Sequence, residues 1–241
     1  MAVSATHYMI VRDLFLHGQV PQHGALLELG EANWYGDVAP QAMVHDIQTL
    51  LTDPARQESL IRWLSDIAAR DDDRVSFDIV KVFYEIYFAP SEVQAVDLGG
   101  TAAAHRFDLN RPMTLNRRFD VVINHGTAEH IFNIGQVFET IHQYTVPGGL
   151  MIHESPFRGW IDHGFYNLQP KLFFDVAEQN QYGIVTMIVA DIIEHTARRV
   201  GTREAFDELA KARKIPENSA LFTVMTKGAL DRPFQWPRIH G

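Results

Sequence analysis

The sequence predicts a single α/β domain with a mostly parallel, seven-stranded sheet, helices on both faces and a helical insert after the first strand. Short apolar runs that end on glycine or polar residues alternate with stretches of helical periodicity, which is typical of parallel strands joined by helices. The chain has 241 residues, of which 46% are hydrophobic, and this is enough apolar material for one core. We therefore expect residues 1–241 to form one domain.

The first strand and the insert follow from local signals. Residues 25–30 (ALLELG) form a short apolar run that closes on glycine, as a buried parallel strand does before a tight turn. The helical insert follows at about residues 40–89. Within it, Asp53 and Pro54 predict a helix start before residues 56–70, and Ser76 predicts the cap of a further helix.

The rest of the chain alternates between strand and helix patterns. Four further strands are predicted at residues 93–97, 104–108, 119–124 and 150–154, with a helix at 134–144 before the last of them. A helix at 171–180, a strand at 183–190, a charged helical segment at 202–214 and a strand at 220–228 complete the domain. The segment at about 228–241, with two prolines and two aromatic residues, predicts an extended tail across the body.

Composition limits the classes of partner. The net charge is -9 and there is no run of Lys or Arg, which argues against binding to nucleic acid or to an anionic membrane and favours a small-molecule partner. The chain has no cysteine, which excludes disulfides and thiolate metal sites. The N-terminal residues lack the pattern of a signal peptide, and no apolar run reaches the ~20 residues of a membrane span. We expect a cytoplasmic protein, and a homo-oligomer stays open.

Polar residues at the ends of the predicted strands are the candidate ligand contacts, because an open parallel sheet binds ligands beyond the carboxyl ends of its strands. An acidic residue at the end of the second strand, here Asp97, suits a ribose diol, since a carboxylate accepts from both hydroxyls. Such residues also serve simply as turn formers. The strand-end residues are Glu28, Gly30, Asp97, Asp108, Asn110, Asn124, His125, His153 and Glu154.

Several segments occur in one characteristic order: LLELG, AVDLGG, HRFDLN, FDVVINHGTAEHIFN, PGG, LMIHE and HGFYNLQPKLFFD. From about Leu26 to Lys227 the chain resembles class I S-adenosylmethionine-dependent methyltransferases, and most of all a bacterial group with GTxEHxFN and HGFYNxQP patterns. The resemblance implies a Rossmann-like fold, S-adenosyl-L-methionine as cofactor, and methyl transfer to an oxygen or nitrogen of a small polar acceptor. Such an acceptor would be a sugar, a nucleotide-sugar or a secondary metabolite.

The resemblance also implies roles for individual residues. Glu28 and Gly30 would contact the methionine part of the cofactor, Asp97 the ribose, and Asp108 with Leu109 the adenine. Asn124, His125 and Gly126 would lie beside the sulfonium. The sequence departs from the family where the usual GxGxG turn is replaced by GEANWYG, residues 30–36. That replacement adds a glutamate near a cation and places two aromatic residues, Trp34 and Tyr35, which either contact the cofactor or anchor the loop.

A histidine-rich rim is the candidate catalytic centre. Methyl transfer to a hydroxyl or amine needs a base, and histidine is the usual base near neutral pH. His163, which lies in a glycine-containing loop after the fifth strand, is the first candidate, and His153 and His125 follow. An ordinary loop histidine is the alternative for His163. For Glu129 and His130 we expect a capping or loop-positioning role.

Two other functions remain open. Histidines of this rim with Glu154 could hold a metal for metal-assisted chemistry, but no HxH or HExxH spacing occurs, so no metal site is predicted. The altered glycine turn is compatible with a binding or regulatory module that catalyses no transfer. Residues 41–70 are predicted to form a lid or an acceptor-side wall. The aromatic residues Phe165, Tyr166, Phe173 and Phe174 either line a pocket or fill the core.

Overall fold

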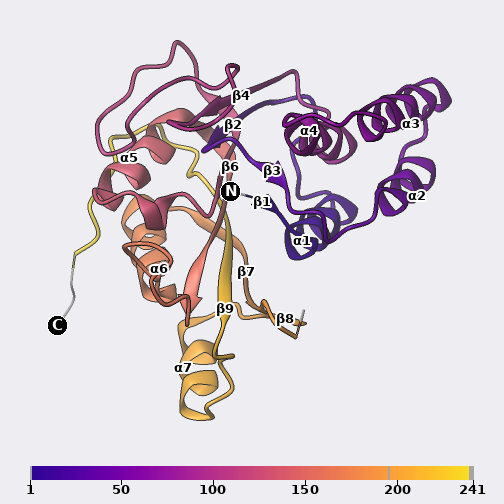
Figure 1. Cartoon of the computed structure of the whole chain (residues 1–241). Helices are drawn as coiled ribbons and strands as arrows, with labels where there is room; N and C mark the ends of the chain where they lie inside the picture. Colours follow the sequence, from indigo (N-terminus) through magenta and orange to yellow (C-terminus); the bar gives the residue numbers. More distant parts are fainter. Residues whose placement is uncertain (1, 195, 239–241) are drawn as a thin grey trace.

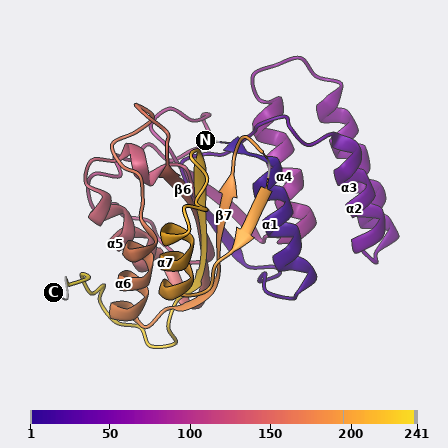
Figure 2. The ribbon, with the colours of Figure 1, turned by 90° about the horizontal axis from the view of Figure 1, so that it is seen from below.

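The computed structural model describes residues 2–194 and 196–238, in which a seven-stranded sheet lies between two layers of helices (Figures 1 and 2). The strands are β1 (Ala2–Val3), β2 (Ala25–Leu29), β3 (Asn33–Trp34), β4 (Glu92–Val96), β5 (Phe119–His125), β6 (Thr145–Arg158), β7 (Gly183–Asp191), β8 (Thr196–Arg199) and β9 (Ser219–Thr226). The helices are α1 (Ala5–Leu16), α2 (Pro40–Leu50), α3 (Pro54–Ala68), α4 (Val75–Tyr87), α5 (Ile134–Tyr144), α6 (Pro170–Asn180) and α7 (Arg203–Lys211), with a short 3-10 helix η1 (Ala128–His130). None of the helices in the described part of the chain has the length and apolarity needed to cross a membrane.

The large sheet has the strand order β4-β2-β5-β6-β9-β7-β8 and is mixed. The four strands β4, β2, β5 and β6 pair in parallel. β9 runs antiparallel to both β6 and β7, and β8 runs antiparallel to β7. The α/β class, the helices on both faces and the number of strands in the sheet are as predicted, but the sheet is less parallel than the sequence indicated.

One predicted strand is wrong. Residues 104–108 make one isolated bridge, between Val96 and His105, in place of a strand. The guanidinium of Arg106 donates to the backbone carbonyls of Asp97, Gly100 and Thr101, so this segment is tied to the loop beside it rather than to a strand ladder. The seventh position of the sheet is taken by β8, which the sequence pattern did not reveal.

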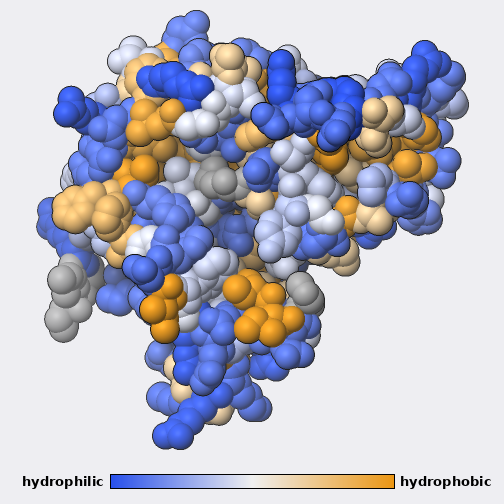
Figure 3. All heavy atoms as spheres, in the orientation of Figure 1, coloured by the Kyte–Doolittle hydropathy of each residue, from blue (hydrophilic) through white to orange (hydrophobic). Residues whose placement is uncertain are grey.

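Successive strand residues point to opposite faces and so build two cores. Leu26, Val121 and Ile152 belong to the core under α1 and α4, whereas their neighbours along the chain belong to the core under α5, α6 and α7. Figure 2 shows these two helical layers on either side of the sheet. Hydrophilic residues cover most of the face seen in Figure 3, and its apolar patches are separate.

The helical insert is confirmed as three helices, but only α4 lies against the sheet. Val80 and Phe83 of α4 are fully buried, whereas α2 and α3 form an outer layer beyond it (Figure 1). The predicted start of α3 is confirmed, since Pro54 is its first residue and the Asp53 carboxylate accepts a hydrogen bond from the Ala55 N–H at 3.0 Å. Ser76 was expected to cap α4 but lies inside it, because the helix begins at Val75.

The N-terminal segment forms elements that the sequence pattern did not predict. β1 pairs in parallel with β3, and α1 follows directly, so the start of the chain lies beside the turn after β2. The buried carboxylate of Asp46 on α2 fixes this arrangement. It accepts hydrogen bonds at 2.6 Å from Tyr8 of α1 and at 2.6 Å from Tyr87 of α4, and at 2.9 Å from Arg12.

The described part of the C-terminal segment, up to residue 238, contacts α5 and α6. The His142 ring lies 2.7 Å from the Arg232 carbonyl, and the Asn180 side chain is bonded to the backbone of Gln235 at both its oxygen and its nitrogen. Phe234 completes the core beneath. Residues 239–241 of the predicted tail lie outside the described residues.

The Asp46 contacts yield a stability prediction. Burial raises the pKa of Asp46, but hydrogen bonds from Arg12, Tyr8 and Tyr87 outweigh burial and hold that pKa below its usual value. Asp46→Ala leaves two buried hydroxyls and a guanidinium without their acceptor, and is expected to lower the free energy of unfolding by about 2 to 4 kcal/mol. Urea unfolding measures this, with the exposed Asp66→Ala on α3 as control. A loss below about 1 kcal/mol would contradict the role given to Asp46.

Candidate functional site

A cavity of about 480 Å³ opens at the carboxyl end of β5, where that strand lies beside β6. Its walls come from the N-terminal segment, from residues 35 and 37, from the ends of β5 and β6, and from the loop after β6. The lining residues are Ala2, Ser4, Thr6, His7, Tyr35, Asp37, His125, Gly126, Glu129, His130, Glu154, Ser155, Pro156, Trp160, His163 and Ile192. The predicted wall at residues 41–70 is wrong for this cavity, because α1 and the segment before it take that place.

An imidazole–carboxylate pair forms the inner part of the cavity. His7 Nε2 lies 2.6 Å from Glu154 Oε2. The Ser4 backbone N–H donates to His7 Nδ1 at 3.1 Å, which makes Nδ1 the acceptor and leaves the proton of a neutral ring on Nε2, facing Glu154. His7 is on α1, distant in the sequence from the strand ends that were predicted to supply the site residues. Only its place three residues after Ser4, at a helix start, distinguishes it in the sequence.

His125 lies behind this pair, as the last residue of β5. Its side chain is 2% exposed, and its ring lies 4.2 Å from the ring of His7. Burial, followed by the neighbouring histidines, lowers the pKa of His125 well below its usual value, so the ring is neutral. Neither ring nitrogen has a hydrogen-bond partner among the described residues. A neutral imidazole has one donor and one acceptor nitrogen, so it can donate one hydrogen bond to a ligand and accept one from it.

The outer part of the cavity holds Glu129, His130 and His163. Glu129 is 1% exposed, and burial raises its pKa to about 8. Its Oε1 lies 3.9 Å from His163 Nε2, and the rings of His130 and His163 are 4.8 Å apart. His163, the first catalytic candidate from the sequence, therefore lines the cavity. The expected capping role falls instead on Asn124, whose side-chain oxygen accepts from the Ala128 N–H at 3.0 Å.

His153 lies in the core, which corrects its predicted place on the rim. It precedes Glu154 on β6, and alternate residues of a strand point to opposite faces, so only Glu154 reaches the cavity. The His153 ring stacks on Phe138 at 5.5 Å and meets the edge of Phe173 at 5.3 Å. Burial lowers its pKa to about 3. Phe173 is also core, whereas Phe165 is exposed.

The residues expected around the methionine part of the cofactor lie elsewhere on the same sheet edge. Glu28 is buried, accepts from the Tyr84 hydroxyl at 2.5 Å and from the Ala32 N–H at 3.3 Å, and has its pKa raised by burial to about 8. The Gly30 N–H donates to the Val96 carbonyl at 2.6 Å. Trp34 is buried against Tyr8 and Phe83 and so anchors the turn, whereas Tyr35 is exposed at the cavity wall.

The candidate ribose contact, Asp97, already has three backbone partners. Its carboxylate accepts N–H bonds from Glu31 at 2.9 Å, Gly99 at 2.6 Å and Gly100 at 3.0 Å. Glu31 is 6% exposed and accepts from the Thr101 hydroxyl at 2.8 Å. A Cβ at Gly100 would lie 2.6 Å from the Glu31 carboxylate, so only glycine allows this close approach. The turn after β2 and the loop after β4 are thus closed on each other.

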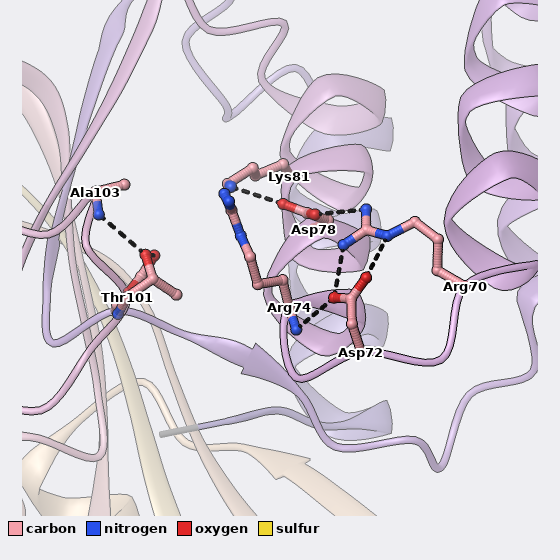
Figure 4. Close-up of polar contacts among 8 residues, drawn as sticks. Arg70, Asp72, Arg74, Asp78, Lys81, Thr101 and Ala103 are labelled. Carbon is pink, nitrogen blue, oxygen red and sulfur yellow. Dashed lines mark hydrogen bonds and ion pairs between the residues drawn. The ribbon is translucent and has the colours of Figure 1, made fainter.

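Figure 4 shows Thr101 on this loop, opposite an ion-pair cluster of Arg70, Asp72, Asp78 and Lys81 at the start of α4. Further along, Asp108 accepts from the Asn110 N–H at 3.0 Å, and bonds to Asn110 lower its pKa. Leu109 is buried in the core under α5. Of the predicted site residues, the structure therefore brings His125, Gly126, Glu154 and His163 together at the cavity, and the Asn124 side chain holds the turn after β5.

Comparison with known proteins supports the fold. No protein-family model matches the sequence, and no curated protein matches it either. Among solved structures, the chain is similar to an S-adenosylmethionine dependent methyltransferase from Mesorhizobium loti, with 12% identity and a TM-score of 0.50 over 93% of this chain and 99% of that one. It is also similar to the N-methyltransferase NodS from Bradyrhizobium japonicum, with 10% identity and a TM-score of 0.47 over 92% and 95% of the two chains. The first likeness shows that the chain shares the Rossmann-like α/β fold of the Mesorhizobium loti protein.

The buried Glu28 predicts a pH dependence of stability. In the folded protein it keeps its proton up to about pH 8, whereas in the unfolded chain it loses the proton near its ordinary pKa of 4.5. Between these values the folded state binds more protons, so stability falls as pH rises. Glu28→Gln keeps both hydrogen bonds and cannot ionise. Its stability relative to the wild type is expected to rise by roughly 2 to 4 kcal/mol between pH 5 and pH 8.

Urea unfolding at the two pH values checks this, with the exposed Glu208→Gln as a matched control that should follow the wild type. Parallel pH curves for Glu28→Gln and the wild type would show that Glu28 is ionised in the folded protein.

Proposed function

We propose that the chain is a methyltransferase that moves a methyl group from S-adenosylmethionine to an oxygen or nitrogen of a small polar acceptor. The observation that carries this proposal is a cavity lined by histidine and glutamate side chains at the carboxyl ends of β5 and β6, the edge of an open α/β sheet where ligands bind. The likeness in fold to the Mesorhizobium loti enzyme, which is described as S-adenosylmethionine dependent, supports the choice of donor.

The expected cofactor site fits S-adenosylmethionine at one end and not at the other. At the reacting end, Glu154 offers a carboxylate and His125 a neutral imidazole beside an open cavity. At the ribose end the residues do not fit as they stand, because Asp97 is engaged by three N–H groups and Glu31 closes the loops. A ribose diol needs two acceptor positions on one carboxylate, and a carboxylate offers about four, of which three are taken on Asp97. Ribose binding therefore needs Asp97 to release one N–H partner, and we expect Glu31 to leave Thr101 when the two loops open.

The acceptor side fits the chemistry without that change. Transfer to a hydroxyl or amine releases one proton, and Glu154, whose Oε2 lies 2.6 Å from His7 Nε2 at the cavity, is placed to take it. The Ser4 N–H, which donates to His7 Nδ1, orients the imidazole beside this carboxylate. Rate can also come from alignment of the reacting atoms, which a pre-formed cavity provides. A volume of about 480 Å³ suits a molecule of sugar or nucleotide size.

A second candidate is a binding module that uses the cavity without catalysis. The closed contact between Glu31 and Thr101 favours it, since this contact occupies the loops that the family uses for its cofactor. The two candidates differ in whether the chain binds S-adenosylhomocysteine and in whether a substituted cavity carboxylate changes turnover.

The test uses Glu154→Gln, which keeps the shape of the side chain and cannot take a proton. Isothermal titration with S-adenosylhomocysteine should show binding to the wild type and to the variant within about twofold of each other. Turnover, followed as S-adenosylhomocysteine formed with a panel of monosaccharides, nucleotide-sugars and small amines, should fall by about 10²- to 10⁴-fold in the variant. Glu208→Gln is the control.

One result would contradict the methyltransferase, and another would contradict the role of Glu154. A wild type that does not bind S-adenosylhomocysteine at millimolar concentration would favour the binding module. Undiminished turnover in Glu154→Gln would keep the methyltransferase and remove the proton role from Glu154.

A further inference from the structure

Three potential metal ligands meet at the outer part of the cavity, although they come from two separate loops. Glu129 and His130 are in η1, and His163 is in the loop after β6. One ligand atom of each lies within 4.8 Å of the others. The nearest measured pair, Glu129 Oε1 and His163 Nε2, is 3.9 Å apart, too far for a hydrogen bond. Two ligands of one ion, each at about 2.0 to 2.2 Å from it, lie roughly 3 to 4 Å apart.

A second observation concerns a carboxyl oxygen of Glu129 that has no hydrogen-bond partner among the described residues. This side chain is 1% exposed, lines the cavity, and its Oε2 has no hydrogen-bond partner within residues 2–194 and 196–238. A buried polar atom without a partner is costly, and native proteins rarely keep one without a ligand, a water or an ion. A cation between Glu129 and the two histidines would satisfy it.

The backbone holds the two loops in register for this arrangement. The Phe165 N–H donates to the Glu129 carbonyl at 2.8 Å. A Cβ at Gly164 would lie 3.0 Å from that carbonyl and 3.2 Å from His130 Nδ1, so any larger residue there would push the two segments slightly apart. On the other side of His163, Trp160 and Asp162 have φ of 55° and 62°, a region that side chains rarely adopt. Strained backbone of this kind is often found at functional sites.

We propose that Glu129, His130 and His163 bind a divalent transition-metal ion at the mouth of the cavity. Two imidazoles and one carboxylate are the ligands of catalytic zinc sites and of non-haem iron sites, both of which keep open positions for water or substrate. Here the three ligands line the same cavity as Glu154. The role of the ion rests on the proposed function: it would bind an acceptor oxygen and lower the pKa of its hydroxyl.

The experiment is a zinc titration of the full chain, after dialysis against a chelator and without donor or acceptor. Isothermal titration is expected to give one Zn²⁺ per chain for the wild type. His163→Ala and Glu129→Gln should weaken binding by about tenfold or more, because even indirect partners of metal ligands change affinity by about 10- to 100-fold. His45→Ala and His105→Ala, at exposed histidines elsewhere, should match the wild type.

A second readout separates a three-ligand site from adventitious surface binding. Co²⁺ bound by two imidazoles and a carboxylate should give a visible d–d spectrum that is absent in His163→Ala, an exposed change that leaves the core intact. Substoichiometric zinc, or equal affinity in His163→Ala and the wild type, would overturn the metal site. Since neither readout involves S-adenosylmethionine, the metal site and the methyltransferase can fail independently.

Discussion

The site depends on the hydrogen bonds that the buried carboxylate of Asp46 accepts. This carboxylate joins α1, α2 and α4 through Tyr8, Arg12 and Tyr87, and so fixes the first helix of the chain against the insert. α1 carries His7 to Glu154 on β6. The cavity wall is therefore built from the N-terminal segment, and its position is set by hydrogen bonds on the far side of α1. Folding of the insert and formation of the cavity are parts of one arrangement.

Two parts of the same sheet edge differ in whether their polar side chains already have partners within the chain. Around β5 and β6, polar side chains face an open cavity, and His125 and Glu129 keep ring or carboxylate atoms without a hydrogen-bond partner among the residues that the structure describes. Around β2 and β4, Glu28, Asp97 and Glu31 are all engaged within the chain. In the proposed methyltransferase the acceptor side would thus be preformed, whereas the donor side would exchange internal hydrogen bonds for a ligand. The free energy needed to open the closed loops is subtracted from the free energy of donor binding, so more stable closed loops mean weaker binding.

Much of the fold could be predicted from local pattern, because apolar runs ending on glycine specify buried strands whatever their neighbours are. The strand predicted at residues 104–108 does not form, because Arg106 binds the carbonyls of the adjacent loop and ties this segment to that loop. The site was harder. Adjacent His153 and Glu154 were both expected at the rim, but strand alternation sends one to each face. His7 and the trio of Glu129, His130 and His163 depend on contacts between distant segments, which no spacing in the sequence reveals.

We propose that methyl transfer takes place in the cavity beside Glu154 and that the donor enters where Glu31 now contacts Thr101. A crystal structure of the protein with S-adenosylhomocysteine tests this most directly. We expect its sulfur to face the cavity between His125 and Glu154, its ribose to lie on Asp97, and the Glu31 carboxylate to have left Thr101. A bound ligand whose sulfur points away from this cavity, or a closed Glu31–Thr101 contact with no ligand at saturating concentration, would contradict the account.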